Sequence, residues 1–369
     1  MQILGIASYK IYPAKMGGQK GVALFYKYLS AITPVTLITT ANNGMPNSNT
    51  INCMPILSNG KLKYINLLYF FGIKKIIKQK AITHIILEHP YYGWLGILLK
   101  WFTGCKLIIH SHNIEALRFK STGSWWWFIL GFYEKWVHKM ADFNFFIHDN
   151  DRNYAINNYK LKSNICTTIT YGIERCEPTT AIEKQAAKKQ LCELHGINII
   201  NRLILFNGTL NYEPNTNALD VILQKINPAL INNFNNYTII ICGNKLPASY
   251  NNLSDVKNVL YAGFVNNIDL YFTGCDMFIN PVVVGGGIKT KLVEALAFNL
   301  KVITTKSGAI GIPNNITGEN MRVVEDENWE QFIAQIKKEY TSTLMIPKSY
   351  FDYFYWGSIA KKAAKFIGV

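Results

Sequence analysis

The chain has 369 residues, enough for two domains of ordinary size. Hydrophobic residues make up 49% of the chain, a share that supports substantial cores and excludes an intrinsically disordered protein. The formal net charge of +15 favours anionic partners, but the lysines form no block of five or more, so a nucleic-acid-binding tail is not indicated.

The cysteines and the apolar runs indicate the cellular compartment in which the protein is expected. Seven cysteines stand singly, without metal-ligand spacing or a Cys-x-x-Cys pair, as is typical of a reduced cytosolic protein. The first eight residues have the pattern of a β-strand and lack the basic start and long apolar core of a signal peptide. No apolar run reaches about 18 residues. We therefore expect a cytoplasmic protein without a membrane-spanning helix.

The first half of the chain alternates short apolar runs with longer segments of mixed pattern. Continuous apolar runs are typical of parallel strands buried on both faces, and their alternation with helices predicts a doubly wound α/β sheet. These runs comprise residues 1–8, 35–39, 85–87, 106–110, 143–147 and 165–169.

A glycine pair, Gly17 and Gly18, opens a helical pattern at residues 22–29, after the first predicted strand. Because glycine has no Cβ, a phosphate or a sugar can approach the backbone closely there. Taken alone, the pair is better explained as a flexible first loop.

A polar cluster follows the predicted strand at residues 106–110. The carboxyl ends of parallel strands are where open α/β sheets bind ligands, so His112 and Asn113 are candidate ligand contacts. Glu115 and Arg118 are weaker candidates. A lone histidine is more often a structural hydrogen-bonding group, and His110, inside the strand end, is expected in the core.

A second series of apolar runs follows a polar, helix-prone stretch at residues 181–195. It predicts a second Rossmann-type domain, and two such domains facing each other leave a cleft between the carboxyl ends of both sheets. These runs comprise residues 202–206, 238–242, 259–262, 277–279, 301–305 and 322–324.

The most informative stretch is residues 280–297, which we interpret as a strand that ends in three glycines and then becomes a helix. The glycines let backbone N–H groups approach a ligand, and the helix N-terminus adds a partial positive charge. Lys289 and Lys291 add full charges, so the stretch predicts a phosphate cradle. Glu294, one turn into the helix, is placed to reach ribose hydroxyls. The three glycines are Gly285, Gly286 and Gly287.

This stretch resembles the nucleotide-sugar-binding motif of retaining glycosyltransferases of family 4. That family has the GT-B fold, in which two Rossmann-like doubly wound domains face each other across a cleft. Many members carry Gly-Gly-Gly-x-x-x-Lys-x-x-Glu-Ala-x-Ala, and Lys291, Glu294, Ala295 and Ala297 stand at the matching positions. The resemblance implies a nucleotide-diphosphate sugar as donor. It also implies that Lys289 and Lys291 act in catalysis by stabilising the leaving diphosphate, and that Glu294 binds the donor.

The resemblance extends to the other motifs. Family 4 members commonly have a glycine pair after the first strand, and a histidine followed by Asp or Asn near the transferred sugar, so His112 is a catalytic candidate. They also have a strand, a glycine and a Pro-Asn pair at the start of the second domain, as in residues 206–215, and Phe264 follows Gly263 in a loop that resembles their nucleobase contact. The donor-binding candidates are Gly17, Gly18, Asn113, Gly208, Thr209, Gly285, Gly286, Gly287 and Glu294.

One position departs from the family pattern. Many members have a second glutamate eight positions before the one at Glu294, and here that position is Gly286. Backbone amides at Gly286 and Gly287 are candidate replacements, and they can bind oxygen but cannot act as bases. We expect no metal cofactor, with lysines in the place of a divalent ion.

Tryptophans gather in the second half of the first predicted domain, at residues 91–102 and 124–130, near basic residues. Such a patch fits an anionic membrane surface, although an aromatic core explains it equally well. The protein is therefore expected to be cytoplasmic, with peripheral attachment to the inner face of the membrane as a candidate setting.

These observations together predict a retaining glycosyltransferase that moves a sugar to a glycan or lipid-linked glycan acceptor, in surface polysaccharide or glycoconjugate synthesis. Residues 1–172 are expected to bind the acceptor and residues 173–369 the nucleotide sugar. The resemblance implies that a last helix, at about residues 350–369, crosses back to the first domain. Two alternatives stay open: a catalytically inactive GT-B binding protein, and a sugar-nucleotide epimerase of the same fold.

Overall fold

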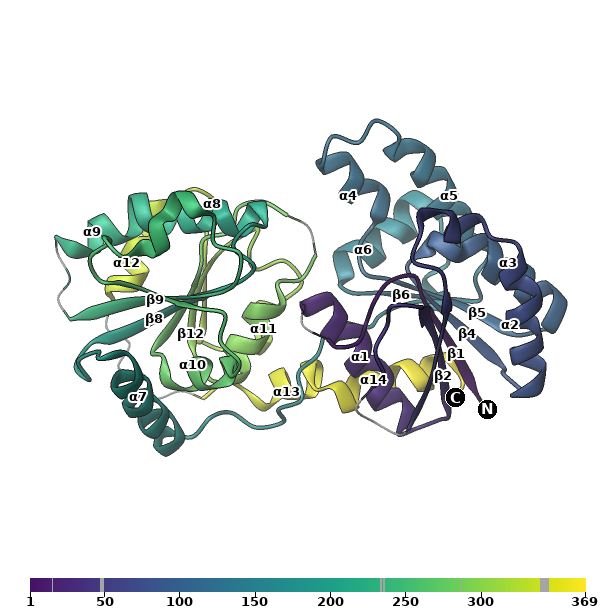
Figure 1. Cartoon of the computed structure of the whole chain (residues 1–369), viewed down its shortest axis with the longest axis horizontal. Coiled ribbons are helices and arrows are strands. Elements are labelled where there is room, and N and C mark those ends of the chain that lie inside the picture. The colour runs from purple at the N-terminus through teal and green to yellow at the C-terminus, as the bar shows by residue number, and fades with distance from the viewer. Residues whose placement is uncertain (15, 47–49, 233, 235, 286, 339–344) are drawn as a thin grey trace. The chain divides into compact units, whose positions relative to one another are not determined.

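The computed structural model describes residues 1–14, 16–46, 50–232, 234, 236–285, 287–338 and 345–369. The chain divides into two compact units. Unit 1 comprises Met1–Glu174 and Phe354–Val369, and unit 2 comprises Arg175–Tyr353. Each unit has one sheet of parallel strands with helices on both faces (Figure 1), which confirms the predicted doubly wound α/β class.

The sheet of unit 1 has the strand order β3-β2-β1-β4-β5-β6-β7. The predicted apolar runs form its strands, but the edge strand β3 was not predicted. Only its first and last residues, Ile51 and Leu57, are buried, and it includes Asn52 and Pro55, so it lacks the continuous buried apolar run of a central strand. The strands are β1 (Ile3–Ala7), β2 (Val35–Thr40), β3 (Ile51–Leu57), β4 (His84–Glu88), β5 (Lys106–Ser111), β6 (Phe143–Phe146) and β7 (Cys166–Thr168).

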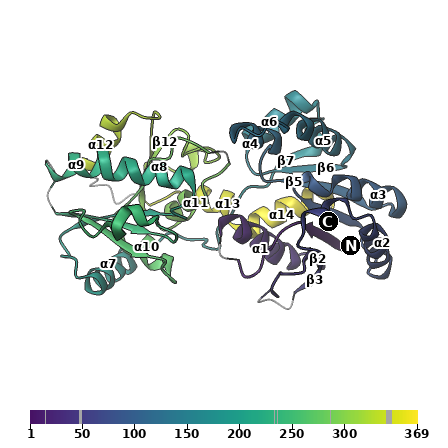
Figure 2. The same ribbon diagram turned by 45° about the horizontal axis from the view of Figure 1, so that its top comes forward.

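Helices cover both faces of this sheet (Figure 2). On one face, α2, α3 and α5 bury apolar side chains such as Ile73, Leu95 and Val137 against the strands. On the other face, α1 packs beside α14, and the C-terminal end of α14 meets β4 where Nε2 of His84 lies 3.2 Å from the carbonyl oxygen of Ile367. The helices are α1 (Gly17–Ser30), α2 (Leu68–Gln79), α3 (Gly93–Thr103), α4 (Glu115–Ser121), α5 (Trp127–Met140), α6 (Asp149–Tyr154) and α14 (Trp356–Ile367).

The sheet of unit 2 has the strand order β10-β9-β8-β11-β12-β13. Its strands are β8 (Arg202–Asn207), β9 (Tyr237–Cys242), β10 (Val259–Gly263), β11 (Met277–Asn280), β12 (Lys301–Thr305) and β13 (Met321–Val324). Its helices are α7 (Ala181–His195), α8 (Glu213–Val221), α9 (Asn227–Ile231), α10 (Ile268–Gly274), α11 (Thr290–Ala297) and α12 (Trp329–Lys337), and α13 (Lys348–Phe354) leads back toward unit 1 in sequence. The core on one face packs α8, α9 and α12 on alternate strand residues such as Ile204 and Ile279. Within the described part of the chain, no helix is both long enough and apolar enough to cross a bilayer.

Candidate active site

The strand order marks one point in each sheet where ligands bind. The order reverses between β1 and β4 in unit 1 and between β8 and β11 in unit 2. Open parallel sheets bind ligands outside the carboxyl ends of the strands at such a point. In unit 2, the loop with Gly208 and Thr209 follows β8, and the loop with Gly285 and Gly287 follows β11. The topology therefore brings two of the sequence-predicted loops together.

Lys291 ties these two loops together. Its Nζ donates to the carbonyl oxygen of Asn207 at 3.1 Å and to Oδ1 of Asn215 at 2.9 Å, and it lies 4.3 Å from the ring centre of Phe206. Among the described residues, no carboxylate lies within ion-pair distance of this ammonium. Burial, together with the positive charge of Lys289, lowers the pKa of Lys291 to about 7. A partly buried cation held only by neutral oxygens is well suited to an anionic ligand.

Lys289 organises the glycine-rich loop itself. Its Nζ donates to the carbonyl oxygens of Gly285 and Gly287 at 2.9 and 3.1 Å. Burial lowers the pKa of Lys289 to about 8. Gly285 has φ 100°, which an L side chain rarely adopts, and a Cβ there would lie 3.4 Å from Cγ of Pro214. The loop is thus packed against the first turn of α8, beside the contacts of Lys291.

The interpretation of residues 280–297 needs one correction. The strand β11 ends at Asn280, five residues before the first glycine, and α11 begins at Thr290 with Lys289 as its N-cap residue. Pro281 cannot donate to a sheet ladder, which is one reason why the strand stops there. Gly286 lies outside the described residues. The segment between strand and helix is therefore a loop, and the two lysines lie at the start of α11.

Glycines also end the neighbouring strands. The N–H of Gly208 donates to Cys242 and the N–H of Gly243 donates to Gly263, so three glycines follow one another across β8, β9 and β10. A Cβ at Gly208 would lie 2.6 Å from Nδ2 of Asn215, and that same amide donates to the carbonyl oxygen of Thr209 at 3.0 Å. The loop therefore has room for backbone alone, as close approach to a ligand requires.

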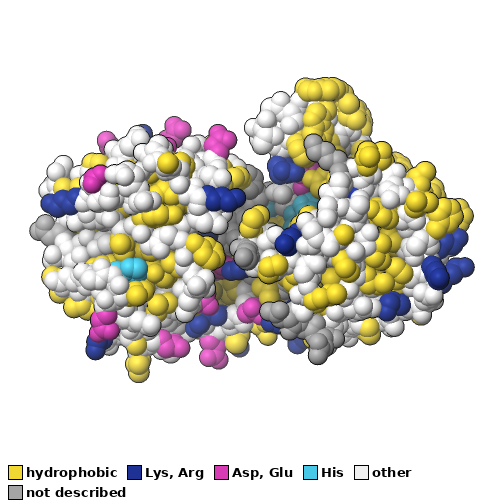
Figure 3. All heavy atoms as spheres, in the orientation of Figure 1, with side chains coloured by type: hydrophobic (Ala, Val, Ile, Leu, Met, Phe, Trp, Pro, Cys, Tyr) yellow, Lys and Arg dark blue, Asp and Glu magenta, His cyan; other side chains and the backbone are white. Residues whose placement is uncertain are grey.

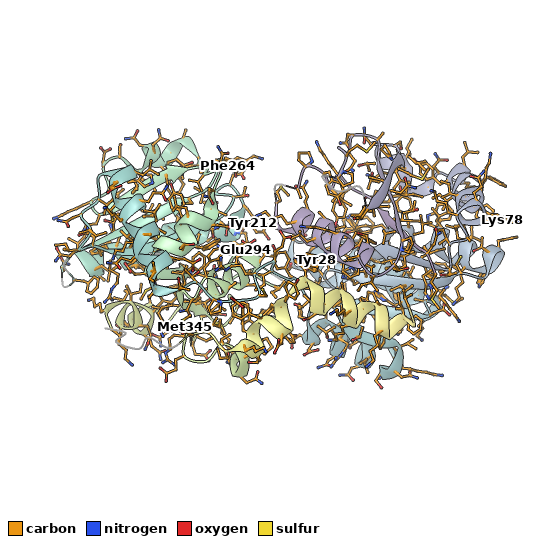
Figure 4. All side chains as sticks on the ribbon, turned by 90° about the horizontal axis from the view of Figure 1, so that it is seen from below. Tyr28, Lys78, Tyr212, Phe264, Glu294 and Met345 are labelled. Carbon is orange, nitrogen blue, oxygen red and sulfur yellow. The ribbon has the colours of Figure 1, made fainter. Side chains whose placement is uncertain are left out.

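Glu294 lies in the second turn of α11 and is partly buried. Figure 4 shows Glu294, Tyr212 and Phe264 along the same side of unit 2. Tyr212 and Phe264 are both exposed, and Phe264 directly follows the last of the strand-end glycines. Tyr212 lies beside the glycine-rich loop, since a Cβ at Gly285 would lie 3.8 Å from its hydroxyl oxygen.

Unit 1 carries the second group of predicted residues. Glu88 ends β4 and pairs in register with His110 on β5, and His112 follows directly after β5. The Glu88 carboxylate lies 2.6 Å from Nε2 of His112 and 3.2 Å from Nδ1 of His110. Burial alone raises the pKa of Glu88, but the two imidazoles outweigh it and hold that pKa well below its usual range. His110 is buried, as expected, but it is part of this polar network.

A second carboxylate lies beside the first. Oε1 of Glu115 is 3.0 Å from Nδ1 of His89, while Oε2 accepts hydrogen bonds from Tyr91 at 2.7 Å and from Arg118 at 2.6 Å. His89 stacks on His112 with ring centres 4.6 Å apart and has φ 68°, an uncommon backbone for a residue other than glycine. Backbone strain of this kind gathers at functional sites.

Among the residues that the structure describes, one group has the spacing of metal ligands. Glu88, His110 and His112 each bring one ligand atom to within 4.8 Å of the other two. The distances between the carboxylate and the two imidazoles are those of hydrogen bonds, so the cluster is complete as a hydrogen-bonded network.

The remaining predicted residues lie at the edges of unit 1. Gly17 and Gly18 form the first residues of α1, and a Cβ at Gly18 would meet no heavy atom within 4 Å. Asn113 is partly buried beside His112. Figure 3 shows histidine side chains at the surface of unit 1 beneath the helices α4 and α5, whose outer ends carry many hydrophobic side chains.

Glu88, His89 and Asn207 are three site residues that the sequence did not single out. Oδ1 of Asn207 is buried and has no hydrogen-bond partner among the described residues. A charged residue directly after an apolar run, as in residues 85–88, was the available signal for Glu88. Asn207 stands in the equivalent position, as the last residue of β8.

The comparisons with known proteins agree with this architecture. Residues 17–175 match the family model described as "Glycosyltransferase Family 4", and residues 201–341 match the one described as "Glycosyl transferases group 1". The chain is 26% identical over 143 residues to an "Uncharacterized 44.6 kDa protein in cps region" of Klebsiella pneumoniae, a match that covers 37% of this chain. The chain spans about a third (35%) of the length of that curated relative.

Solved structures share the fold over the whole chain. A sucrose-phosphate synthase from Thermosynechococcus elongatus has a TM-score of 0.74 at 15% identity, covering 100% of this chain and 98% of that one. HepE from Anabaena, in complex with UDP and glucose, has a TM-score of 0.70 at 14% identity, covering 100% and 99%. A glycosyltransferase from Rickettsia africae has a TM-score of 0.69 at 16% identity, covering 99% and 98%. The predicted GT-B fold is confirmed, and with family models matching both of its halves, the chain belongs to the family 4 glycosyltransferases.

Proposed function

We propose that this protein transfers a sugar, with retention of its anomeric configuration, from a nucleotide-diphosphate sugar to a glycan or lipid-linked glycan acceptor. The observation that carries the proposal is the position of Lys291. Its ammonium joins the loops after β8 and β11 at the switch point of the sheet and has only neutral partners among the described residues. The family 4 resemblance supplies retention, and the HepE complex with UDP and glucose supports the class of donor.

Sugar transfer from such a donor requires stabilisation of the nucleoside diphosphate that leaves as an anion. As the bond between the anomeric carbon and the diphosphate breaks, negative charge grows on the diphosphate. The acceptor oxygen bonds to that carbon and its proton passes to the departing diphosphate, so atoms and charge balance. Lys291 and the N-terminus of α11 are fixed before the reaction, so they stabilise this charge without reorganising. Lys289 adds a second positive charge. The proposal needs no metal ion, since the cations come from the protein.

The other donor contacts follow from the same loops. Glu294 is assigned to the ribose hydroxyls, which a carboxylate binds by accepting two hydrogen bonds. Phe264 is exposed next to Gly263 and offers a ring for stacking on the nucleobase. Gly208, Thr209, Gly285 and Gly287 offer backbone groups to the diphosphate. In unit 1, His112 and Asn113 are assigned to the transferred sugar, and Gly17 and Gly18 to close approach of the donor.

We further propose that unit 1 attaches peripherally to the anionic inner face of the cytoplasmic membrane, where a lipid-linked acceptor is available. Residues 1–174 and 354–369 contain 22 lysines and arginines against 7 aspartates and glutamates, whereas residues 175–353 contain 16 of each. The whole net charge of +15 therefore belongs to unit 1, and three of its acids, Glu88, Glu115 and Glu134, are buried.

Exposed apolar side chains accompany this charge. They lie on α2, α3 and α5, which pack side by side, and on the segment before α5. Trp125 and Phe132 are each 74% exposed. Amphipathic aromatic rings favour the membrane interface, and lysines near an anionic leaflet each add about 1 kcal/mol of attraction. The exposed set is Leu68, Phe71, Trp101, Phe102, Trp125, Phe128, Ile129, Phe132 and Trp136.

A screen of nucleotide sugars by thermal unfolding tests the donor assignment. A ligand that binds the native state raises the midpoint with the logarithm of its concentration. We expect at least one nucleotide-diphosphate sugar to stabilise the protein, and NMR of the product to show the anomeric configuration of the donor. Stabilisation by none of the common donors would contradict the proposal, and binding without transfer to any glycan or lipid-linked glycan would favour an inactive binding protein.

A further inference from the structure

The contacts of the Glu88 carboxylate determine which ring nitrogen of His110 and of His112 carries a hydrogen atom. An ionised carboxylate can only accept hydrogen bonds, and Glu88 is held in its ionised form by the two imidazoles. The ring nitrogens that face it must therefore carry the hydrogen atoms. His112 donates its Nε2–H at 2.6 Å, and His110 donates its Nδ1–H at 3.2 Å.

This assignment fixes the other edge of the His112 ring. Burial, together with the proximity of His89, lowers the pKa of His112 to about 4, so the ring is neutral near pH 7. A neutral imidazole with its hydrogen on Nε2 has a lone pair on Nδ1. Among the described residues Nδ1 of His112 has no hydrogen-bond partner, and the side chain is 15% exposed. The atom is thus an acceptor that a ligand can reach.

The ring is also held in place. His89 stacks on His112 at 4.6 Å between ring centres, and His110 lies 4.8 Å away at a tilt of 42°. Glu115 in turn bonds His89 and does not bond His112, so the two carboxylates hold different rings of the same stack. Rotation of His112 would break its hydrogen bond with Glu88 and this stacking together.

We propose that Glu88 is a positioning residue that holds His112 in the Nε2–H tautomer, so that Nδ1 accepts a hydrogen bond from a sugar hydroxyl. The identity of the ligand as a sugar rests on the proposed function. The tautomer itself does not, because it follows from the contacts of the protein alone. An acidic partner that selects the tautomer of a histidine is an established way of aiming an imidazole at a substrate.

The direct test is nitrogen-15 NMR of the histidine side chains in the ligand-free wild type near pH 7, with His112→Gln used to assign the signals. We expect Nε2 of His112 to carry the hydrogen atom and Nδ1 to be unprotonated. A hydrogen atom on Nδ1, whether in the other tautomer or in a doubly protonated ring, would overturn the proposal. This outcome is independent of whether the protein transfers a sugar.

Variants give a second readout. In Glu88→Gln a neutral amide with one accepting oxygen and one donating nitrogen replaces the carboxylate, so the hold on the Nε2–H tautomer of His112 weakens, and a ring that faces the nitrogen must accept and change its tautomer. We expect kcat to fall by about 10²-fold, as for loss of one aimed hydrogen-bonding group, with the affinity for a nucleoside diphosphate unchanged. Glu115→Gln is the matched control and should leave the tautomer of His112 as it is. Unaltered spectra and kcat in Glu88→Gln would overturn the positioning role.

A zinc titration separates this role from metal binding. If Glu88 only positions the two imidazoles, we expect no specific Zn²⁺ site at this cluster. The contrary result would be binding of one Zn²⁺ to the wild type that is lost in Glu88→Gln. Such binding would make the carboxylate a metal ligand and would overturn the proposal.

Discussion

Nζ of Lys291 lies 2.9 Å from Oδ1 of Asn215, which joins the first turn of α11 to the first turn of α8. The two helices follow β11 and β8, the strands between which the order of the sheet reverses. Their N-termini therefore converge on one place, and each adds a partial positive charge there. The contact explains why a cation can be placed at this point without an acidic partner: the neutral amide and a carbonyl hold it in position for an anion.

Replacing Lys291 should abolish most of the activity and leave the fold intact. We expect Lys291→Ala to lower turnover by about 10²-fold or more, the usual cost of losing one group that stabilises the transition-state charge. Lys189→Ala is the matched control, because that side chain is exposed on α7 of the same unit. The measurement is steady-state kinetics with a nucleotide sugar that the wild type uses as donor. Full activity in both Lys291→Ala and Lys289→Ala would show that the site lies elsewhere.

The lowered pKa of Lys291 predicts a pH dependence of nucleotide binding. The free protein begins to lose the proton of Lys291 near pH 7, whereas a bound diphosphate favours the charged form and raises that pKa. Affinity for a nucleoside diphosphate should therefore fall as pH rises above about 7. Lys291→Met should flatten this dependence in calorimetric titrations at several pH values. Equal slopes in wild type and variant would contradict the assignment.

The same pKa predicts how stability varies with pH. In the unfolded chain the lysine has its ordinary pKa of about 10.5, so between about pH 7 and 10.5 the unfolded state binds more protons than the folded state. The free energy of unfolding contributed by this group therefore rises with pH across that window. Denaturant titrations should show the rise in wild type and a smaller one in Lys291→Met. A rise of the same size in both would mean that the lysine is not desolvated.

Glu294 should act on donor binding more than on folding. We expect Glu294→Gln to weaken donor affinity by about tenfold, since hydrogen bonds to a charged group are worth about 1.5 kcal/mol or more. Glu193→Gln, on an exposed side of α7, is the control. Calorimetric titration of the donor gives the dissociation constants, and an unchanged value for Glu294→Gln would rule out the ribose contact.

The membrane proposal makes a prediction that depends on charge. The protein should sediment with anionic vesicles at low salt and be released as salt rises, because screening weakens surface attraction. Trp125→Ala combined with Phe132→Ala should weaken the association without unfolding the protein, since both side chains are exposed. Ile182→Ala with Leu194→Ala is the matched control, because both are exposed apolar residues on α7 of unit 2, which has no net charge. Absence of binding to anionic vesicles at low salt would contradict the proposal.

Local patterns made much of the fold predictable. The runs at residues 202–206 and 301–305 became β8 and β12 because a parallel strand buried on both faces consists of consecutive apolar residues. The helix at residues 181–195 could be predicted from composition, and it begins at a capping box between Thr180 and Glu183. The edge strand β3 has no such run, because only some of its residues are buried.

The site was predictable only in part, because its contacts join distant segments. The strand-to-helix loops were marked by glycines and lysines in the sequence. The pairing of Glu88 with His110 depends on the register of β4 against β5, which no local pattern contains. The burial of Lys291 likewise depends on Asn207 and Asn215, more than 70 residues away along the chain. The tryptophans near residue 125 were equally compatible with core and surface, and the structure places Trp125 at the surface.

The central claim is that the loops after β8 and β11 bind a nucleoside diphosphate through Lys291. The most direct measurement is calorimetric titration of UDP, ADP, GDP, CDP and dTDP into the wild type and into Lys291→Met at neutral pH. We predict that at least one diphosphate binds the wild type with a stoichiometry of one, and binds the variant at least about tenfold more weakly, as loss of a charge-assisted contact requires. Failure of all five to bind the wild type, or equal affinity for wild type and variant, would contradict the account.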